Sequence, residues 1–275
     1  MLRLMGACMI REPIVAGQFY PGSAEGLRRM LESMVDDRAE KVEAFGVISP
    51  HAGYIYSGMV AGAVISRVKF TDTFVMLGPN HTGQGKDFSI MTEGPWVTPL
   101  GEVNIDTPLA KQILASSSHL KDDREAHQYE HSLEVQVPFL QYFKADVRIV
   151  PIILAQARGS VYKKIGKELA ASIKESKRHV VILASSDMTH YERQESARKK
   201  DNKAIEAILN LDGDELLRRI ADFDISMCGY APVVALISAA KELGATKAEL
   251  VKYQTSGDAS GDYRSVVGYA GILLR

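Results

Sequence analysis

The feature that most limits how this chain can fold is the alternation of short apolar runs with longer patterns of helical spacing. The runs are rich in β-branched residues and are predicted to form strands over residues 44–49, 72–77, 146–154, 179–185, 249–254 and 266–274. Between them, apolar residues recur three and four positions apart, which predicts helices over about residues 23–35, 58–68, 107–117, 160–175, 195–210, 213–221 and 231–243. This alternation is typical of a three-layer α/β/α fold, with helices on both faces of a mostly parallel mixed sheet.

A chain of 275 residues is long enough for one large α/β domain. No repeat, low-complexity segment or flexible linker divides the sequence, so we expect a single domain over residues 1–275. Translation could also begin at Met9, and residues 1–12 are a candidate for a dispensable N-terminal extension. The longest stretch without clear regular structure is 78–106, apart from a candidate antiparallel strand over 87–92, and loops of such length tend to be functional.

Charge and cysteine content narrow the classes of partner and compartment. The chain carries 33 basic and 34 acidic residues and a net charge of -1, with neither sign in long blocks, so neither nucleic acid nor a membrane is an expected partner. The two cysteines, Cys8 and Cys228, are too far apart for a disulfide framework, which favours a reducing compartment. The apolar stretch before Arg11 is too short for a signal peptide or a membrane span. We therefore expect a cytoplasmic protein.

Imidazoles and a carboxylate follow three of the predicted strands. His51 and His81 each follow the end of one strand. Asp187 and His190 follow a third strand, over 179–185. In an open parallel sheet, ligands bind beyond the carboxyl ends of the strands, where side chains from different strands converge. A single histidine at such a place is more often a structural residue, but three at equivalent places favour a shared site.

Cys228 stands shortly before the helical pattern over 231–243. A thiol at a helix N-terminus is expected to have a lowered pKa because the helix dipole stabilises the thiolate, which prepares it as a ligand or a nucleophile. Free cysteine is also one of the most commonly buried residue types, so an inert structural role is the alternative. Together with two of the histidines, the thiolate would form a three-ligand metal site with open positions for water or substrate.

The stretch EAHQYEHSLEVQVPFLQ, residues 125–141, is the other dense group of polar residues. His127 and His131 are four residues apart and would share a helical face, so a second metal site is conceivable, although this spacing alone is a weak signal. We prefer Glu130 and His131 as groups that support a metal ligand or position the substrate near the same cleft. Glu134 is expected to cap a helix or to be paired.

Several motifs in a fixed order carry a resemblance to a known family. They are VAGQFYP, SPHAGYIYSG, LGPNHTG, EHSLEVQVPFLQ, SSDMTHY, CGYAPV and TSGDASGDYRSVVGYA. Together they resemble the Memo family, named for a mediator of ErbB2-driven cell motility, and the match runs from about Val15 to Leu274. Prokaryotic members are also named as protein B of the AmmeMemoRadiSam system, so the resemblance implies association with an AMMECR1-like protein and a radical SAM protein.

The Memo family is similar in fold and cleft position to the class III extradiol dioxygenases of the LigB type. Those enzymes hold Fe(II) with two histidines and a glutamate, and a further histidine acts as acid and base while O2 opens a catechol ring. By motif, His51 and His81 match the two histidine ligands, and Cys228 stands where the carboxylate would be. His190 matches the acid/base histidine, and we expect the nearby Asp187 to fix its tautomer.

The thiol in place of a carboxylate changes what can be expected of the site. A thiolate is softer and donates more charge, so the site should accept Cu(I), Zn(II) or Fe(II), with iron or copper favoured. Catechol cleavage therefore does not follow from the fold.

Three functions remain open. The first is a metal-dependent redox enzyme that resembles the dioxygenases and takes a small molecule in its cleft. The second is a module that binds a peptide or a partner protein, with Phe19, Tyr20, Tyr54 and Tyr56 lining a groove, although burial is the commoner fate of such residues. The third is a zinc hydrolase, in which the metal lowers the pKa of a bound water molecule.

Overall fold

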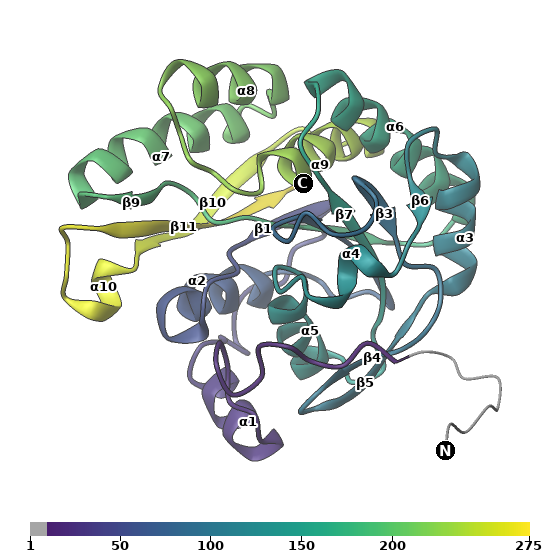
Figure 1. Ribbon diagram of the computed structural model, residues 1–275, viewed down its shortest axis with the longest axis horizontal. Helices are drawn as coiled ribbons and strands as arrows, with labels where there is room; N and C mark the ends of the chain where they lie inside the picture. Colours follow the sequence, from purple (N-terminus) through teal and green to yellow (C-terminus); the bar gives the residue numbers. More distant parts are fainter. Residues whose placement is uncertain (1–9) are drawn as a thin grey trace.

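A twisted mixed β-sheet runs through the middle of the protein, with helices on both of its faces (Figure 1). The structure is a computed structural model and describes residues 10–275. Its strands are β1 (Gly46–Ser49), β2 (Thr73–Pro79), β3 (Phe88–Ile90), β4 (Trp96–Thr98), β5 (Gly101–Ile105), β6 (Lys121–Asp122), β7 (Arg148–Leu154), β8 (Val181–Ser185), β9 (His190–Glu192), β10 (Ala248–Thr255) and β11 (Val266–Leu274). The predicted three-layer α/β/α architecture is confirmed.

The strand order explains why residues far apart in the sequence meet at one edge of the sheet. Along its main path the order is β10-β11-β1-β8-β2-β7-β3-β6. The central strands β1, β8, β2 and β7 run parallel to one another, whereas β11 and β3 pair antiparallel with β1 and β7. The candidate antiparallel strand over 87–92 is thus confirmed as β3. Because the four central strands are parallel, their carboxyl ends lie along the same edge.

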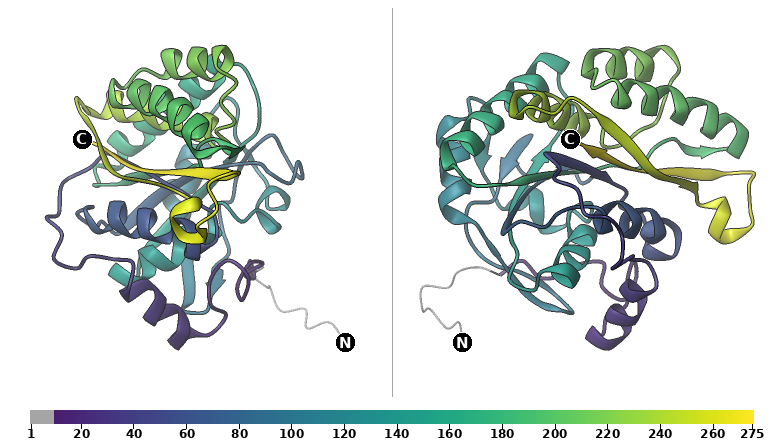
Figure 2. Two further views of the ribbon diagram at one scale, coloured as in Figure 1. Left: turned by 90° about the vertical axis from the view of Figure 1, so that its left-hand side faces the viewer. Right: turned by 180° about the vertical axis from the view of Figure 1, so that it is seen from behind.

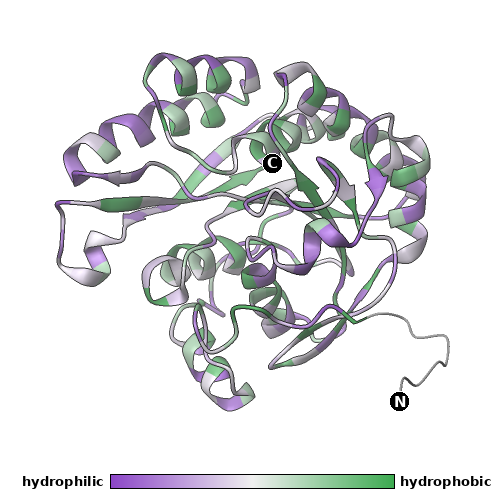
Figure 3. Cartoon of the chain, viewed as in Figure 1, coloured by the Kyte–Doolittle hydropathy of each residue, from purple (hydrophilic) through white to green (hydrophobic). Residues whose placement is uncertain are grey.

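Helices and one 3-10 turn pack around the sheet. They are α1 (Ala24–Glu32), α2 (Tyr54–Ser66), α3 (Thr107–Ser116), α4 (Glu125–Gln128), η1 (Glu134–Gln136), α5 (Val137–Phe143), α6 (Gly159–Ser176), α7 (Gln194–Leu209), α8 (Gly213–Asp222), α9 (Tyr230–Leu243) and α10 (Gly257–Ser260). Helices α6 to α9 lie over one face of the sheet, and α1, α2 and α5 lie over the other (Figures 1 and 2). Because both faces are covered, the central strands are almost wholly buried and read as continuous apolar runs (Figure 3).

Local signals fix the ends of two helices. The helix α3 begins after Asp106, whose carboxylate accepts the backbone N–H of Leu109 at 3.2 Å, and Pro108 stands in its first turn. The helix α9 ends at Gly244, which adopts a φ of 110°, a conformation that glycine reaches without steric cost. Because α9 packs against β8 and β2, the loop before it, which carries Cys228, is held beside the carboxyl ends of those strands.

Two parts of the chain differ from the sequence-based expectation. The helix expected over 58–68 already begins at Tyr54, and Gly53 is its N-terminal cap. The sequence around Gly53 indicates a turn, which hides the start of the helix. The stretch 78–106 contains β4 and β5 as well as β3; β4 and β5 pair with each other, and β5 also pairs with β7. These strands are too short for their alternation to be read from the sequence.

The N-terminal part of the described chain is anchored in the core. Arg11 is 2% exposed, and its guanidinium donates to the backbone carbonyl of His127 at 3.1 Å. Residues 1–9 lie outside the described residues, and a dispensable N-terminal extension would have to end before Arg11. Within residues 10–275, no helix combines the length and the apolar character needed to cross a bilayer.

Candidate metal centre

The carboxyl ends of β1, β2 and β8 bring together three polar residues that are distant in the sequence. His51 follows β1, His81 follows β2, and Asp187 follows β8, which lies between the other two strands in the sheet. Cys228 comes from the loop between α8 and α9, and its sulfur accepts the backbone N–H of Asp187 at 3.3 Å. The structure therefore brings the two histidines, the carboxylate and the thiol to one edge of the sheet.

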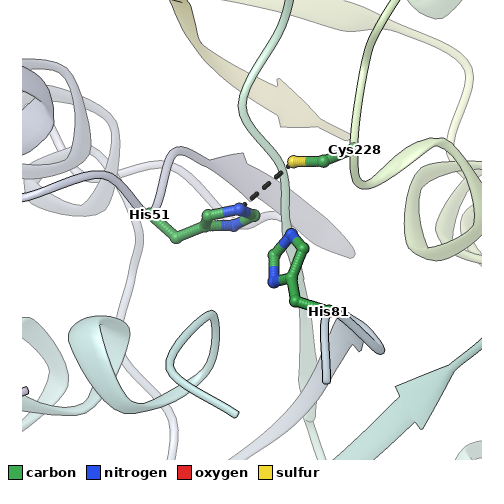
Figure 4. A group of neighbouring side chains, drawn as sticks. All are labelled: His51, His81 and Cys228. Carbon is green, nitrogen blue, oxygen red and sulfur yellow. Dashed lines mark hydrogen bonds between the residues drawn. The ribbon is translucent and has the colours of Figure 1, made fainter. Parts of the chain in front are cut away.

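His51, His81 and Cys228 point one donor atom each toward one another (Figure 4). The three donor atoms all lie within 4.8 Å of one another, and Cys228 Sγ is 3.2 Å from His51 Nε2. The centres of the two imidazole rings are 5.1 Å apart. Two imidazole nitrogens and one sulfur in this arrangement could hold a transition-metal ion and leave coordination positions open.

Glu130 holds His81 in place. Its carboxylate accepts the backbone N–H of His81 at 2.7 Å and contacts His81 Nδ1 at 2.9 Å. Burial acts to raise the pKa of Glu130, but the contact with His81 outweighs it and lowers the pKa to about 2, so the carboxylate is ionised. Burial in turn lowers the pKa of His81, but the Glu130 carboxylate outweighs it and raises this pKa. Because Nδ1 is engaged, Nε2 is the nitrogen that faces Cys228.

His131 lies beside both rings of the centre. Its ring stacks on that of His81 at 4.9 Å and lies 5.6 Å from that of His51. Its Nδ1 is 3.6 Å from Glu130, so His81, Glu130 and His131 form a second group of candidate ligands. Oxygen Oε1 of Glu130, however, already accepts the N–H of Ser132 at 2.8 Å as well as contacting His81 Nδ1. The carboxylate is therefore an anchor for His81 rather than an open ligand.

The expectation that His127 and His131 share a helical face is wrong. The helix α4 ends at Gln128, so the two histidines lie on different elements. His127 is fully buried; its ring centre is 6.1 Å from that of Trp96, and its Nε2 is 2.9 Å from the Ser89 hydroxyl. His127 is therefore a core residue, and it does not form a second metal site with His131.

Acid is expected to destabilise the fold partly through His127. Burial, followed by the charge of Arg11, lowers the pKa of His127 from the usual 6.5 to about 3. Between these values the unfolded chain binds one more proton, so the stability that His127 contributes is present above pH 6.5 and is lost as the pH falls toward 3, by at most about 1.4 kcal/mol per pH unit. Denaturation at several pH values should show a smaller loss of stability with acid in His127→Gln than in the unaltered protein. Equal losses would contradict this assignment.

His190 opens β9 at the cleft with its tautomer fixed. Its Nδ1 lies 2.9 Å from the backbone carbonyl of Ser226, and because a carbonyl oxygen only accepts, Nδ1 carries the proton. The lone pair of Nε2 is left to accept a proton. The expectation that Asp187 fixes this tautomer is wrong, because its carboxylate instead accepts the backbone N–H of His51 at 2.7 Å.

Burial determines the charge of Cys228 and Asp187. It raises the pKa of the Cys228 thiol well above the usual value, and the nearby Asp187 raises it further. It also raises the pKa of Asp187 to about 6, against the effect of the N–H donated by His51. The expectation that the helix dipole lowers this thiol pKa is wrong. The helix begins only at Tyr230, and the loss of hydration on burial has a larger effect on the pKa than the helix dipole. A metal ion would have to displace the thiol proton.

Gly229 allows the loop that carries Cys228 to approach β8. A Cβ atom at this position would lie 2.4 Å from the carbonyl oxygen of Ser185 and 2.4 Å from Cβ of Ser186. The backbone N–H of Gly229 donates to the Ser186 hydroxyl at 3.1 Å. Any larger residue here would push the thiol away from His51.

A cleft of about 470 Å³ opens beside the three donor atoms. It is lined by Phe19, His51, Ala52, Gly53, His81, His131, Asp187, His190, Tyr191, Ser226, Cys228 and Val267. A second hollow of about 370 Å³ adjoins the cleft and shares His81, Ser226 and Cys228 with it. His81 and Cys228 thus line both hollows, whereas His51 lines only the larger one.

The aromatic residues expected in the cleft are divided between cleft and core. Phe19 lines the cleft, and its ring centre lies 5.1 Å from that of His131. The expectation for Tyr20 and Tyr54 is wrong: they are 3% and 1% exposed, and each donates its hydroxyl to a buried acceptor. Both belong to the core, where a tyrosine hydroxyl needs such a partner.

Tyr191 and Ser226 are cleft residues that the sequence did not reveal. Tyr191 is 79% exposed and adopts a φ of 59°, in the left-handed region that few residues other than glycine occupy. The hydroxyl of Ser226 accepts the backbone N–H of His190 at 2.8 Å. A backbone conformation and a contact between two loops leave no periodic signal in a sequence.

Comparisons with known proteins agree along nearly the whole chain. A family model described as Memo-like protein matches residues 11–273. A MEMO1 family protein of Methanococcoides burtonii is 45% identical over 274 residues, which cover 97% of this chain and 100% of that protein. A MEMO1 family protein of Aquifex aeolicus is 44% identical over 267 residues, which cover 96% of this chain and 99% of that protein.

One solved structure is similar in fold. It is the crystal structure of an uncharacterized protein of Escherichia coli K12, with a TM-score of 0.50 and 14% sequence identity, and the match covers 82% of this chain and 98% of that one. At this level of identity the likeness concerns the fold alone.

Proposed function

This chain belongs to the Memo family, and we propose that it is a metal-dependent redox protein in which His51, His81 and Cys228 hold one iron or copper ion. The observation that carries the proposal is the meeting of two imidazole nitrogens and one thiol within 4.8 Å at the edge of the sheet. The cleft beside them would take a small-molecule substrate.

The residues fit a bound metal in two respects. Each histidine has its Nδ1 engaged by a buried partner, Ser185 for His51 and Glu130 for His81, which leaves both Nε2 atoms for coordination. The third donor is a thiol, and a soft ligand favours copper, iron or zinc over magnesium or calcium. A bound iron or copper ion would supply redox chemistry and would polarise a ligand in the cleft.

His190 is proposed to move protons in this reaction. It lines the same cleft as the three donor atoms, and its Nε2 has a lone pair because Nδ1 donates to Ser226. Asp187, whose pKa burial raises to about 6, is a second group that can exchange a proton not far from neutral pH. The rings of Phe19 and His131 would contact the apolar part of the substrate.

The family also supports a proposal about location and partners. We propose that the protein acts in the cytoplasm together with an AMMECR1-like protein and a radical SAM protein. Co-purification from the native host after mild crosslinking is expected to recover at least one of the two. Recovery of neither would contradict the association.

A second candidate function, a peptide-binding module, is favoured by one observation. Ile55, Tyr56 and Met59 are 62%, 40% and 42% exposed on the first turns of α2, which begins beside the cleft residue Gly53. Exposed apolar side chains next to a cleft are typical of a surface that binds a protein segment. In this case ligand binding would be unaffected by a chelator and by His190→Ala, whereas the redox proposal predicts an effect of both on turnover.

Metal analysis tests the redox proposal. Protein purified anaerobically under reducing conditions is expected to contain close to one equivalent of iron or copper. His51→Ala should retain less than about a tenth of it, because removal of a ligand costs more than removal of an outer partner. His179→Ala, which alters an exposed histidine just before β8, should retain all of it. Full occupancy in His51→Ala would contradict the proposal, and zinc alone in the unaltered protein would favour a hydrolase.

A further inference from the structure

The hydroxyl of Ser185 lies at the centre of a buried hydrogen-bond network behind His51. Its oxygen is 2.7 Å from the carbonyl oxygen of Ser132, 2.9 Å from Gln136 Nε2 and 2.9 Å from His51 Nδ1. Ser132, Ser185 and Gln136 are 0% exposed, and His51 is 2% exposed. The direction of each hydrogen bond is therefore set by these groups and not by bulk water.

The network determines which nitrogen of His51 carries the proton. A hydroxyl has one proton to donate and two lone pairs that accept. The carbonyl of Ser132 only accepts, so it receives the Ser185 proton. The amide nitrogen of Gln136 only donates, so it occupies one lone pair of Ser185. The remaining lone pair can only accept, and the proton between Ser185 and His51 therefore belongs to Nδ1.

The orientation of the Gln136 amide is fixed by a separate contact. Its Nε2 is also 2.8 Å from the carbonyl oxygen of Pro50, directly before His51. Rotation of the amide by half a turn would place Oε1 against that carbonyl and lose the hydrogen bond. Among the described residues Oε1 has no hydrogen-bond partner, so nothing favours the opposite orientation.

We propose that Ser185 and Gln136 are positioning residues that hold His51 in the tautomer with Nδ1 protonated. The lone pair of Nε2 then points at Cys228, whose Sγ is 3.2 Å away. The value of this arrangement for coordination rests on the proposed metal function, because a histidine binds a metal through an unprotonated nitrogen. His51 is ready to coordinate before any metal arrives.

Three histidines that line the cleft, His51, His81 and His190, each have a protonated Nδ1 but donate to different acceptors. His81 contacts the carboxylate of Glu130, and His190 contacts the carbonyl of Ser226, and neither of these acceptors has a proton to donate. His51 alone depends on a hydroxyl, which could donate or accept. This difference explains why His51 requires further partners, the Ser132 carbonyl and the Gln136 amide, that orient the hydroxyl.

The tautomer can be measured in metal-free protein. Long-range imidazole spectra of 15N-labelled protein distinguish a protonated from an unprotonated ring nitrogen, and the His51 signals are those lost in His51→Ala. We expect a protonated Nδ1 and an unprotonated Nε2. A protonated Nε2 on His51 in the unaltered protein would overturn the proposal, whether or not the protein binds metal.

Ser185→Ala removes the acceptor and should release His51. Both tautomers are then expected in the spectrum, and zinc, used as the probe, should bind about 10–100-fold more weakly. Ser185→Thr keeps the hydroxyl and should restore a single tautomer. Ser172→Ala is the matched control, because it removes an equally buried hydroxyl, bonded within α6, and should change neither the spectrum nor the zinc affinity.

A second variant covers the case in which Ser185→Ala does not fold. Gln136→Met keeps Ser185 but removes one of the two partners that orient its hydroxyl, so a mixture of tautomers is expected. A single unchanged tautomer together with an unchanged zinc affinity in either folded variant would overturn the proposal. A protein that shows the expected tautomer but binds no zinc, iron or copper would contradict the metal function and leave the role of Ser185 intact.

Discussion

Replacing Glu134 by alanine is expected to lower the free energy of unfolding by about 3–5 kcal/mol, because it breaks a buried ion pair. The partner is Arg11, and both side chains are 1% exposed. The carboxylate also accepts the N–H of Ile14 at 2.9 Å, the N–H of Val15 at 3.0 Å and the hydroxyl of Tyr20 at 2.7 Å. Alanine would leave a buried guanidinium without its counter-charge and these donors without an acceptor.

Urea denaturation measures this loss, and two further variants identify its cause. Glu195→Ala breaks an exposed ion pair with Lys199 on α7 and should change stability by less than about 0.5 kcal/mol. The double variant Arg11→Met with Glu134→Leu removes both charges and should cost less than the sum of the two single changes. A loss below about 1 kcal/mol in Glu134→Ala would show that the pair contributes little.

The same ion pair also supports the candidate metal centre. Arg11 donates through Nη2 to the backbone carbonyl of Glu130 at 2.7 Å, so it holds the residue that anchors His81. Glu134 lies in the segment that also carries Gln136, the residue behind His51. We therefore expect Glu134→Ala to weaken metal binding even under conditions in which the variant remains folded.

The outline of the site could be predicted because it depends on strand ends. Continuous apolar runs such as 72–77 and 179–185 mark strands buried on both faces, and the residues that follow parallel strands must reach one edge. His51, His81 and Asp187 could be placed together on this ground alone. Predicting that these residues lie near one another required no knowledge of side-chain contacts.

The hydrogen bonds that organise the site could not be predicted. Ser185 meets Ser132 and Gln136 only through the fold, and no local pattern distinguishes a buried serine or glutamine from an exposed one. The prediction of the charge of the thiol was wrong for a related reason. The sequence places Cys228 near the start of a helix, but it does not reveal the burial that outweighs the helix dipole.

Short elements escaped prediction where tertiary contacts outweigh local preference. The helix α5 spans only Val137–Phe143 and carries Pro138 in its first turn, so its apolar residues give too short a pattern to identify. Tyr54 begins α2 inside a glycine-rich stretch, and its ring packs 4.8 Å from that of Phe139 on α5. The contact between α2 and α5, rather than the local sequence of either helix, determines where both helices form.

Replacing Cys228 by serine is expected to abolish the binding of Cu(I). A serine hydroxyl is a harder donor than sulfur and stays protonated near neutral pH, whereas Cu(I) prefers a thiolate. The loss of affinity should exceed the roughly 10–100-fold that removal of an outer-shell partner costs. Competition with a chromogenic Cu(I) chelator measures it, and Cys8→Ser, which alters the other cysteine of the chain, is the control.

Cys228→Asp then tests whether the sulfur selects the metal. Aspartate supplies a carboxylate in place of the thiol, and a carboxylate is a harder donor than a thiolate. Fe(II) binding should therefore survive this change better than Cu(I) binding, because His51 and His81 still provide two nitrogens. If Cys228→Ser bound Cu(I) as tightly as the unaltered protein, the sulfur would not be a ligand. If Cys228→Asp lost both metals equally, the position of the sulfur beside His51, and not its softness, would be what the centre requires.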